Sequence, residues 1–358
     1  MLVIALLPSF VTQKTQASPF AAVDTRLKPQ NNTSSLENFI YASVLPSGAI
    51  ATHPDKTFVS PYLANIATQA LAKSCTASNR KIAKRYLTWY ARNSVNGVVS
   101  EFTVSSGQTT PTNSQDSQDA SAGTFLSAYA ALVANSPKSR VRPSLHQAAI
   151  AAVYRIALLQ DSGGLTWAKP SWKVKYLMDQ VEVFWGLTEA SAVFPKKSKI
   201  RNTARKLAVR LAIGVRTLWD PKVGMFAVAK HQDGSITSPT VSRTYPDVVS
   251  QFWVLSSPLA SKEQARKLMM AIKPSFSTFF DPNSSWKVND GSEPVGYWPL
   301  LSTVYTRAKM TNTAFTYRSS LFYAAQKSEY RWPYNISTAG LLLIPRTVFT
   351  KTSTHCSR

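Results

Sequence analysis

The chain has 358 residues, of which 44% are hydrophobic and 11% aromatic, and this much apolar material excludes a wholly disordered protein. Lys and Arg number 41 against 18 Asp and Glu, so the net charge is +23 and the surface should attract polyanions. Glycine-rich phosphate loops, the GxSxG esterase motif and the HExxH zinc motif are all missing, and the four His and two Cys are scattered, so we expect neither a cofactor nor a metal site.

The N-terminus resembles an export signal. Met1 to Val11 is an apolar run too short to cross a bilayer, and the small residues Ala17 and Ser18 would suit cleavage. A buried N-terminal segment is the alternative. We therefore predict a signal peptide over 1–17, secretion or a place in the cell envelope, and no membrane span. Export would permit a disulfide between Cys75 and Cys356, although both cysteines could equally be free.

Amphipathic helical patterns occur in pairs along the chain. The predicted pairs are 62–73 with 80–92, 120–133 with 145–159, 176–192 with 200–218, 247–255 with 262–272, and 295–305 with 312–325. The first member of each early pair is rich in apolar and small residues, as a helix buried on several sides should be. The second member carries Lys and Arg on one face. The densest basic run, from Lys196 to Arg210, is therefore interpreted as a solvated outer face, and no specific nucleic-acid partner is expected.

A glycine followed by a short apolar stretch recurs after the second helix of the early pairs. These units begin at Gly97, Gly164 and Gly224, and Trp286 marks a further unit at a similar distance. The spacing is near 60 residues, which over the whole chain gives about six units and indicates a repeat architecture.

Both ends of the chain are needed to complete six pairs. Leu36 to Val44 can form an outer helix and Ser337 to Leu343 an inner one, which gives twelve helices in two concentric rings. This all-α pattern, with short strands in the loops, resembles the six-hairpin (α/α)6-barrel glycosidases. An open superhelical solenoid is the competing fold. We predict a flexible segment over 18–35, the barrel over 36–347 and a tail over 348–358.

In such a barrel every outer-to-inner connection delivers the chain to the N-terminal end of an inner helix, so the long loops meet at one mouth. The predicted long loops are 46–56, 95–118, 160–175, 219–244, 274–293 and 327–335. Long loops gathered at one end are where function is expected. The helix N-termini there favour carboxylates and oxygen-rich ligands.

Asp116 and Asp119 flank the predicted start of the second inner helix. Their spacing can place both on one side of the helix. The segment is similar to the Asp-rich helix entry of family 8 glycoside hydrolases, which implies carboxylates that engage sugar and the catalytic water. The spacing here is wider than the Asp-x-Asp of that family. Helix capping is the alternative, since Asp at an N-cap satisfies free N–H groups.

Asp179 and Glu182 share one face of the otherwise apolar third inner helix. A carboxylate buried there would have a raised pKa, which suits a general acid. A structural salt bridge with Lys175 or a neighbouring Arg is the alternative. We predict Asp119, Glu182 and Asp179 as catalytic candidates, with Asp119 and Glu182 as the preferred pair.

Further polar and aromatic residues near the predicted loops are candidate substrate ligands, because aromatic faces stack on sugar rings and carboxylates bind hydroxyls. They are Asp116, Asp247, Tyr62, Trp167, Lys169, Trp172, Trp253 and Trp298. Core packing is the alternative for each aromatic taken singly.

These features lead to a secreted glycoside hydrolase that cleaves a polysaccharide by paired-carboxylate chemistry, and the basic surface favours an acidic polymer. We expect a monomer. A polysaccharide lyase on the same barrel would depend instead on a tyrosine base such as Tyr176 and on Lys169. A non-catalytic envelope protein that binds polyanions is the third possibility.

Overall fold

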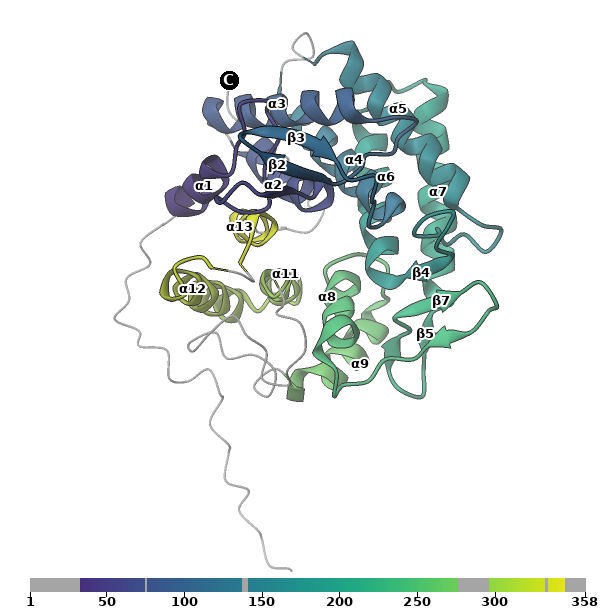
Figure 1. The fold of residues 1–358 in the computed structure, drawn as a ribbon. Coiled ribbons are helices and arrows are strands. Elements are labelled where there is room, and N and C mark those ends of the chain that lie inside the picture. Colours follow the sequence, from purple (N-terminus) through teal and green to yellow (C-terminus); the bar gives the residue numbers. More distant parts are fainter. Residues whose placement is uncertain (1–32, 75, 137–140, 276–295, 332–333, 345–358) are drawn as a thin grey trace, which may run out of the picture.

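Twelve α-helices alternate between an inner and an outer position in the computed structural model, which describes residues 33–74, 76–136, 141–275, 296–331 and 334–344. The inner helices are α2 (Pro61–Lys73), α4 (Gln118–Ala134), α6 (Leu177–Val193), α8 (Val249–Leu255), α11 (Pro299–Arg307) and α13 (Ile336–Leu343). The outer helices are α1 (Thr33–Ala42), α3 (Ala77–Asn93), α5 (Pro143–Leu159), α7 (Lys199–Arg216), α9 (Lys262–Ile272) and α12 (Thr311–Lys327). Figure 1 shows the inner six around a common centre.

The inner helices close into a ring. Each packs against the next, from α2 through α4, α6, α8 and α11 to α13, and α13 packs against α2. The first outer helix, α1, pairs with the last inner helix, α13. The closed (α/α)6 barrel predicted from the sequence is therefore confirmed, and the open solenoid is excluded.

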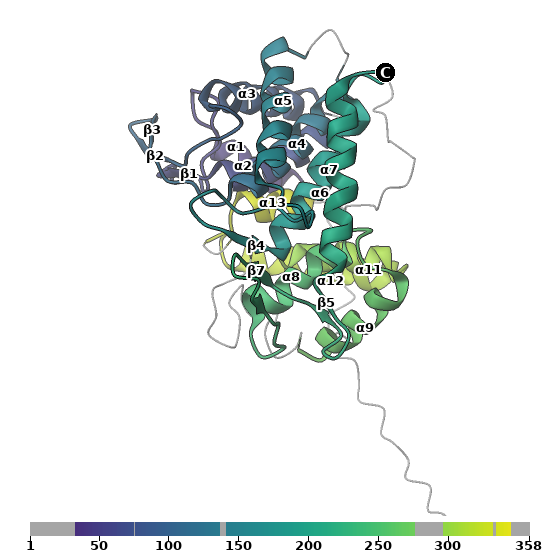
Figure 2. The same ribbon diagram turned by 90° about the vertical axis from the view of Figure 1, so that its right-hand side faces the viewer.

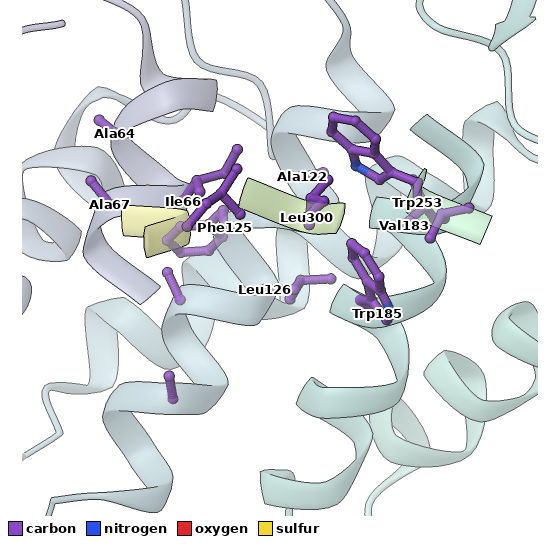
Figure 3. Close-up of a cluster of buried hydrophobic side chains, with 14 of the residues drawn as sticks. Ala64, Ile66, Ala67, Ala122, Phe125, Leu126, Val183, Trp185, Trp253 and Leu300 are labelled. Atoms are coloured by element: carbon purple, nitrogen blue, oxygen red, sulfur yellow. The ribbon is translucent and has the colours of Figure 1, made fainter. Parts of the chain in front are cut away.

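Glycines allow neighbouring inner helices to approach closely. A Cβ on Gly186 of α6 would lie 2.1 Å from the carbonyl oxygen of Gly123 on α4, and a Cβ on Gly340 of α13 would lie 2.8 Å from the Cα of Ala67 on α2. Only a residue without a side chain fits at such contacts. Around them, core side chains from five inner helices interdigitate, among them Trp185 and Trp253 (Figure 3).

The inner-to-outer turns within the described ranges are short, whereas the outer-to-inner connections are long, as predicted. Strands in these long connections link neighbouring loops. β1 (Phe58–Val59) pairs with β2 (Phe102–Ser105), which pairs with β3 (Gln108–Pro111). β4 (Val174–Tyr176) pairs with β7 (Ala229–His231), which pairs with β8 (Ile236–Thr237). In Figure 2 the β1-β2-β3 sheet projects beside the helical body.

The repeated glycine unit is a tight turn that follows an outer helix. Gly97, Gly164 and Gly224 all have positive φ angles, and the last lies between β5 (Trp219–Asp220) and β6 (Met225–Phe226). An equivalent turn at Gly48, closed by a bridge between Val44 and Ile50, extends the series to the first outer helix. The strands expected directly after Gly97 and Gly164 are each reduced to a single bridge, between Val95 and Val98 and between Gln160 and Thr166.

The barrel begins with α1 at Thr33, three residues before the predicted boundary, since the helix includes the end of the segment expected to be flexible. The predicted signal peptide, the C-terminal tail, Cys75, Cys356 and Trp286 lie outside the described residues. Within the described ranges, no helix is both long and apolar enough to span a bilayer.

Candidate functional site

A pocket of about 490 Å³ opens at the loop end of the barrel. It is lined by Tyr62, Asp116, Ser117, Ala120, Ala168, Lys169, Trp172, Tyr176, Met178, Asp179, Tyr245, Pro246 and Tyr297. Most of these residues occupy the first turn of an inner helix or the residues just before it. The topology alone therefore brings them together from five successive connections.

Ser117 connects two buried aspartates at the entries of α4 and α6. Its Oγ lies 2.7 Å from Oδ1 of Asp119 and 2.6 Å from Oδ2 of Asp179. Asp119 is fully buried and also accepts hydrogen bonds from the backbone N–H of Ala120 (2.8 Å) and the hydroxyl of Thr166 (2.6 Å). Asp179 lines the pocket.

This arrangement requires a proton on one of the two carboxyl groups. A serine hydroxyl has one hydrogen and can donate to only one of them, so the other short contact needs a carboxyl O–H that donates to Oγ. Asp119 also accepts the backbone N–H of Ala120 and lies close to the Thr166 hydroxyl, whose one hydrogen is shared with Oε1 of Gln180 (3.0 Å). A backbone N–H donor favours the ionised form, and Asp179 has none among the described residues, so we assign the proton to Asp179, the member of the pair that lines the pocket.

The electrostatics agree with this assignment. Burial, followed by the charge of Asp119, raises the pKa of Asp179 well above its usual value. Burial also raises the pKa of Asp119, and its hydrogen bonds to Ser117 and Thr166 oppose that rise. A carboxyl group with a raised pKa in a pocket is what a general acid requires.

Asp116 is the other carboxylate that lines the pocket among the described residues, and it is exposed. Partial desolvation raises its pKa, while the charge of Lys169 acts in the opposite direction. Lys169 also lines the pocket, and its Nζ donates to the backbone oxygen of Gln115 (2.6 Å). This contact holds the ammonium beside the Asp116 segment.

Glu182 lies behind the pocket wall and does not line the pocket. Its Oε1 accepts a hydrogen bond from the hydroxyl of Tyr62 (2.7 Å) and another from Nε1 of Trp253 (3.0 Å). Tyr62 lines the pocket, whereas Trp253 is 1% exposed and belongs to the core (Figure 3). The structure therefore separates the predicted pair: Glu182 orients Tyr62, and Asp119 supports Asp179 through Ser117.

Asp247 is fully buried and does not line the pocket. Its carboxylate accepts from Nε of Arg243 (2.8 Å) and from the backbone N–H of Thr240 (2.7 Å). It lies in the turn η2 (Thr244–Val248) that leads into α8, next to the cis peptide bond between Tyr245 and Pro246. These bonds fix the loop that carries Tyr245 into the pocket.

The predicted tryptophans occupy different environments. Trp172 is 52% exposed at the pocket, and its Nε1 donates to the hydroxyl of Tyr176 (3.0 Å). Trp167 lies outside the pocket lining, with Nζ of Lys175 3.9 Å from its ring centroid. Lys175 forms an ion pair with Asp161 rather than with either acid of α6. Trp298 is fully buried against Phe252.

Sequence reasoning did not select Ser117, Tyr245 or Tyr297 as site residues. Each precedes an inner helix by a few residues, and that shared position is the signal that could have identified them. Asp290 and Glu293, the acids at the end of the predicted long loop 274–293, lie outside the described residues. Among the residues that the structure describes, no three His, Cys, Asp or Glu side chains gather as metal ligands.

No protein-family model matches the sequence, and no curated protein matches it. Solved structures do match the fold. A family 63 mannosylglycerate hydrolase from Thermus thermophilus, bound to glucose, has a TM-score of 0.65 and 10% identity over 87% of this chain and 98% of its own. A family 76 α-mannanase from Bacteroides thetaiotaomicron has a TM-score of 0.56 and 12% identity over 88% and 93%.

A third match is an inactive variant of a family 76 α-1,6-mannanase from Salegentibacter, in which two adjacent aspartates are changed to asparagine. It is bound to α-1,6-mannotriose and has a TM-score of 0.57 and 9% identity over 88% of this chain and 97% of its own. The protein thus has the helical-barrel fold of family 63 and family 76 glycoside hydrolases. At this level of identity the fold is what the comparisons establish. The similarity to family 8 remains a prediction.

Proposed function

We propose that the protein is a glycoside hydrolase that cleaves a polysaccharide at the pocket formed by the inner-helix entries. The observation that carries the proposal is the contact of the single Ser117 hydroxyl with both Asp119 and Asp179, from which we infer a proton on Asp179 at the pocket surface. The barrel shared with glycosidases supports it. The N-terminal sequence supports secretion or a place in the cell envelope.

In this mechanism Asp179 protonates the leaving glycosidic oxygen. Asp116, the second carboxylate at the pocket, activates water or attacks the anomeric carbon. Asp119 is a positioning residue that acts through Ser117, and Glu182 positions Tyr62. Trp172 offers an exposed ring to a sugar face, and Tyr245 and Tyr297 offer hydroxyl groups. The hydroxyl of Tyr62 donates to Glu182, so its oxygen can accept a hydrogen bond from a sugar hydroxyl. Lys169 would neutralise an acidic substituent on the substrate.

A lyase that uses Tyr62, Tyr245 or Tyr297 as its base is less well supported by the same pocket, whereas Tyr176, which also lines it, stays the base of the lyase alternative. A tyrosine base must lose its proton readily, but burial raises the pKa of Tyr245 to about 12 and also raises the pKa of Tyr62 and of Tyr297 well above the usual tyrosine value. A neutral tyrosine suits a hydrogen-bond donor better than a base.

The test is a panel of neutral and uronate-containing polysaccharides, including α-mannans, with reducing ends and unsaturated products measured separately. We expect reducing ends only. Asp179→Asn should lower kcat about 100- to 10,000-fold, the usual contribution of a general acid. Asp116→Asn should also lower kcat, and Glu263→Gln, on the outer helix α9, is the control. Unsaturated products, or full activity in both aspartate variants, would overturn the proposal.

A further inference from the structure

A second hollow lies on the outside of the barrel, along α3. Its volume is about 280 Å³, and it is lined by Ser47, Lys81, Lys84, Arg85, Thr88, Trp89, Arg92 and Arg142. We call it the α3 groove. None of its lining residues belongs to the pocket at the loop end.

The charge of the α3 groove is uncompensated. Lys81, Lys84 and Arg85 stand three and four residues apart on one face of α3, where like charges repel. No carboxylate lines the groove, and within the described chain none of its five cations forms an ion pair. On α9, by contrast, Arg266 and Lys267 both pair with Glu263. Positive charge gathered in a concave surface concentrates anions.

The floor of the groove is fixed by packing. Nη2 of Arg85 donates to the carbonyl oxygen of Pro46 (3.0 Å), which ties the α1–α2 loop to α3. Gly48 packs against the same helix, since a Cβ there would lie 3.1 Å from the carbonyl oxygen of Arg85. Trp89 is 5% exposed and contacts Phe102 edge-to-face. The groove therefore exists before any ligand binds.

The residues that line the α3 groove fit some classes of polyanion better than others. Single-stranded nucleic acid needs exposed aromatic rings on which bases stack, and the one aromatic residue here is buried. An anionic membrane surface is bound most firmly when apolar side chains accompany the charges, and no exposed large apolar residue lines the groove. The hydroxyls of Ser47 and Thr88 among the cations suit a ligand that carries both anions and hydroxyl groups.

We infer that the α3 groove binds a segment of an anionic polysaccharide, with its carboxylate or phosphate groups on the lysines and arginines. The inference rests on the proposed function in one respect, namely that the polymer bound by this protein is a polysaccharide. The groove would hold a chain at a distance from the pocket and would raise affinity for long acidic polymers over short ones.

The experiment measures binding of polygalacturonate by titration calorimetry with the full chain carrying Asp179→Asn, which prevents turnover. The groove variant combines Lys81→Gln, Lys84→Gln and Arg92→Gln. The matched control combines Lys199→Gln, Arg205→Gln and Lys206→Gln on α7, which removes the same charge from an exposed helix. We expect the groove variant to lose affinity about tenfold, with a smaller salt dependence, and the control to lose about twofold or less.

An equal loss in both variants would overturn the inference, because diffuse charge would then explain binding. Tighter groove-dependent binding of single-stranded DNA or phosphatidylserine vesicles would also overturn it. The titration measures binding and does not depend on catalysis. If the wild-type protein cleaves no polymer, the proposed function is refuted, but the measured binding to the α3 groove is unaffected. Conversely, cleavage of short oligosaccharides at an unchanged rate in the groove variant, on the wild-type background, would support a role separate from the pocket.

Discussion

The hydroxyl of Ser117 lies 2.6 Å from the carboxyl group of Asp179. All three predicted catalytic acids are among the described residues, and Asp179 is the one that lines the pocket. The same hydroxyl contacts Asp119. The two carboxyl groups therefore hold one proton between them, and the serine hydroxyl bridges the ionised and the protonated member of the pair. The serine therefore sets the protonation of the pair, although it has no acid or base role of its own.

Replacing Ser117 should narrow the pH range of activity. The hydroxyl stabilises the singly ionised pair because it donates to one carboxylate and accepts from the other acid. In Ser117→Ala that state loses both hydrogen bonds, and we expect the basic limb of the kcat profile to move to lower pH. Ser117→Thr, which keeps a hydroxyl, should restore the limb. A Ser117→Ala profile that is lower at every pH but unchanged in shape would contradict the shared proton.

Asp179 should make the stability of the protein depend on pH. Its folded-state pKa is raised by burial, so its stabilising contribution is fully present below the unfolded value of about 3.9 and is lost as the pH rises through the folded pKa. Asp179→Asn keeps a donor for Ser117 without the buried charge. We expect it to be more stable than the wild type above the folded pKa by about 1 to 3 kcal/mol, with the difference shrinking in acid. Urea unfolding across pH measures this, and a difference independent of pH would contradict it.

Asp247 should contribute to stability rather than to substrate binding. Asp247→Ala leaves the backbone N–H of Thr240 and the guanidinium of Arg243 without their shared acceptor. We expect a loss of about 1 to 3 kcal/mol in the free energy of unfolding, and any rise in KM should accompany that loss because the loop that carries Tyr245 is no longer fixed. Asp247→Asn, which can still accept from Thr240, should lose less. A raised KM with unchanged unfolding would instead show that Asp247 is a substrate ligand, as the sequence suggested.

Gly186 should tolerate no side chain. In Gly186→Ala the new Cβ would lie 2.1 Å from the carbonyl oxygen of Gly123, so α4 and α6 must separate. We expect a destabilisation of about 3 kcal/mol, seen in thermal or denaturant unfolding. The control is Gly234→Ala, where φ is +88° and no atom lies within 4 Å, so only backbone strain of about 1 to 2 kcal/mol applies. Equal losses in the two variants would mean that the close approach of the helices is not the cause.

The helix pairs and the position of the mouth were predictable because both depend on local pattern and chain order. Apolar spacing marks a helix from its own residues, and alternation of inner and outer helices decides where each loop emerges. The roles of the acids depend on distant residues and were not predictable. Glu182 is hidden by Tyr62 and Trp253, from two other helices, and Lys175 pairs with Asp161 instead of with its neighbours on α6. Ser117 carries no signal of its own in the sequence.

The contact of α13 with both α1 and α2 means that the two ends of the described chain meet on one side of the ring. The packing of the ring therefore does not depend on which helical hairpin carries the chain termini. Circular permutants with new termini in the connection between α6 and α7, and a linker between the old ends, should retain the pocket, because every inner helix would keep both neighbours.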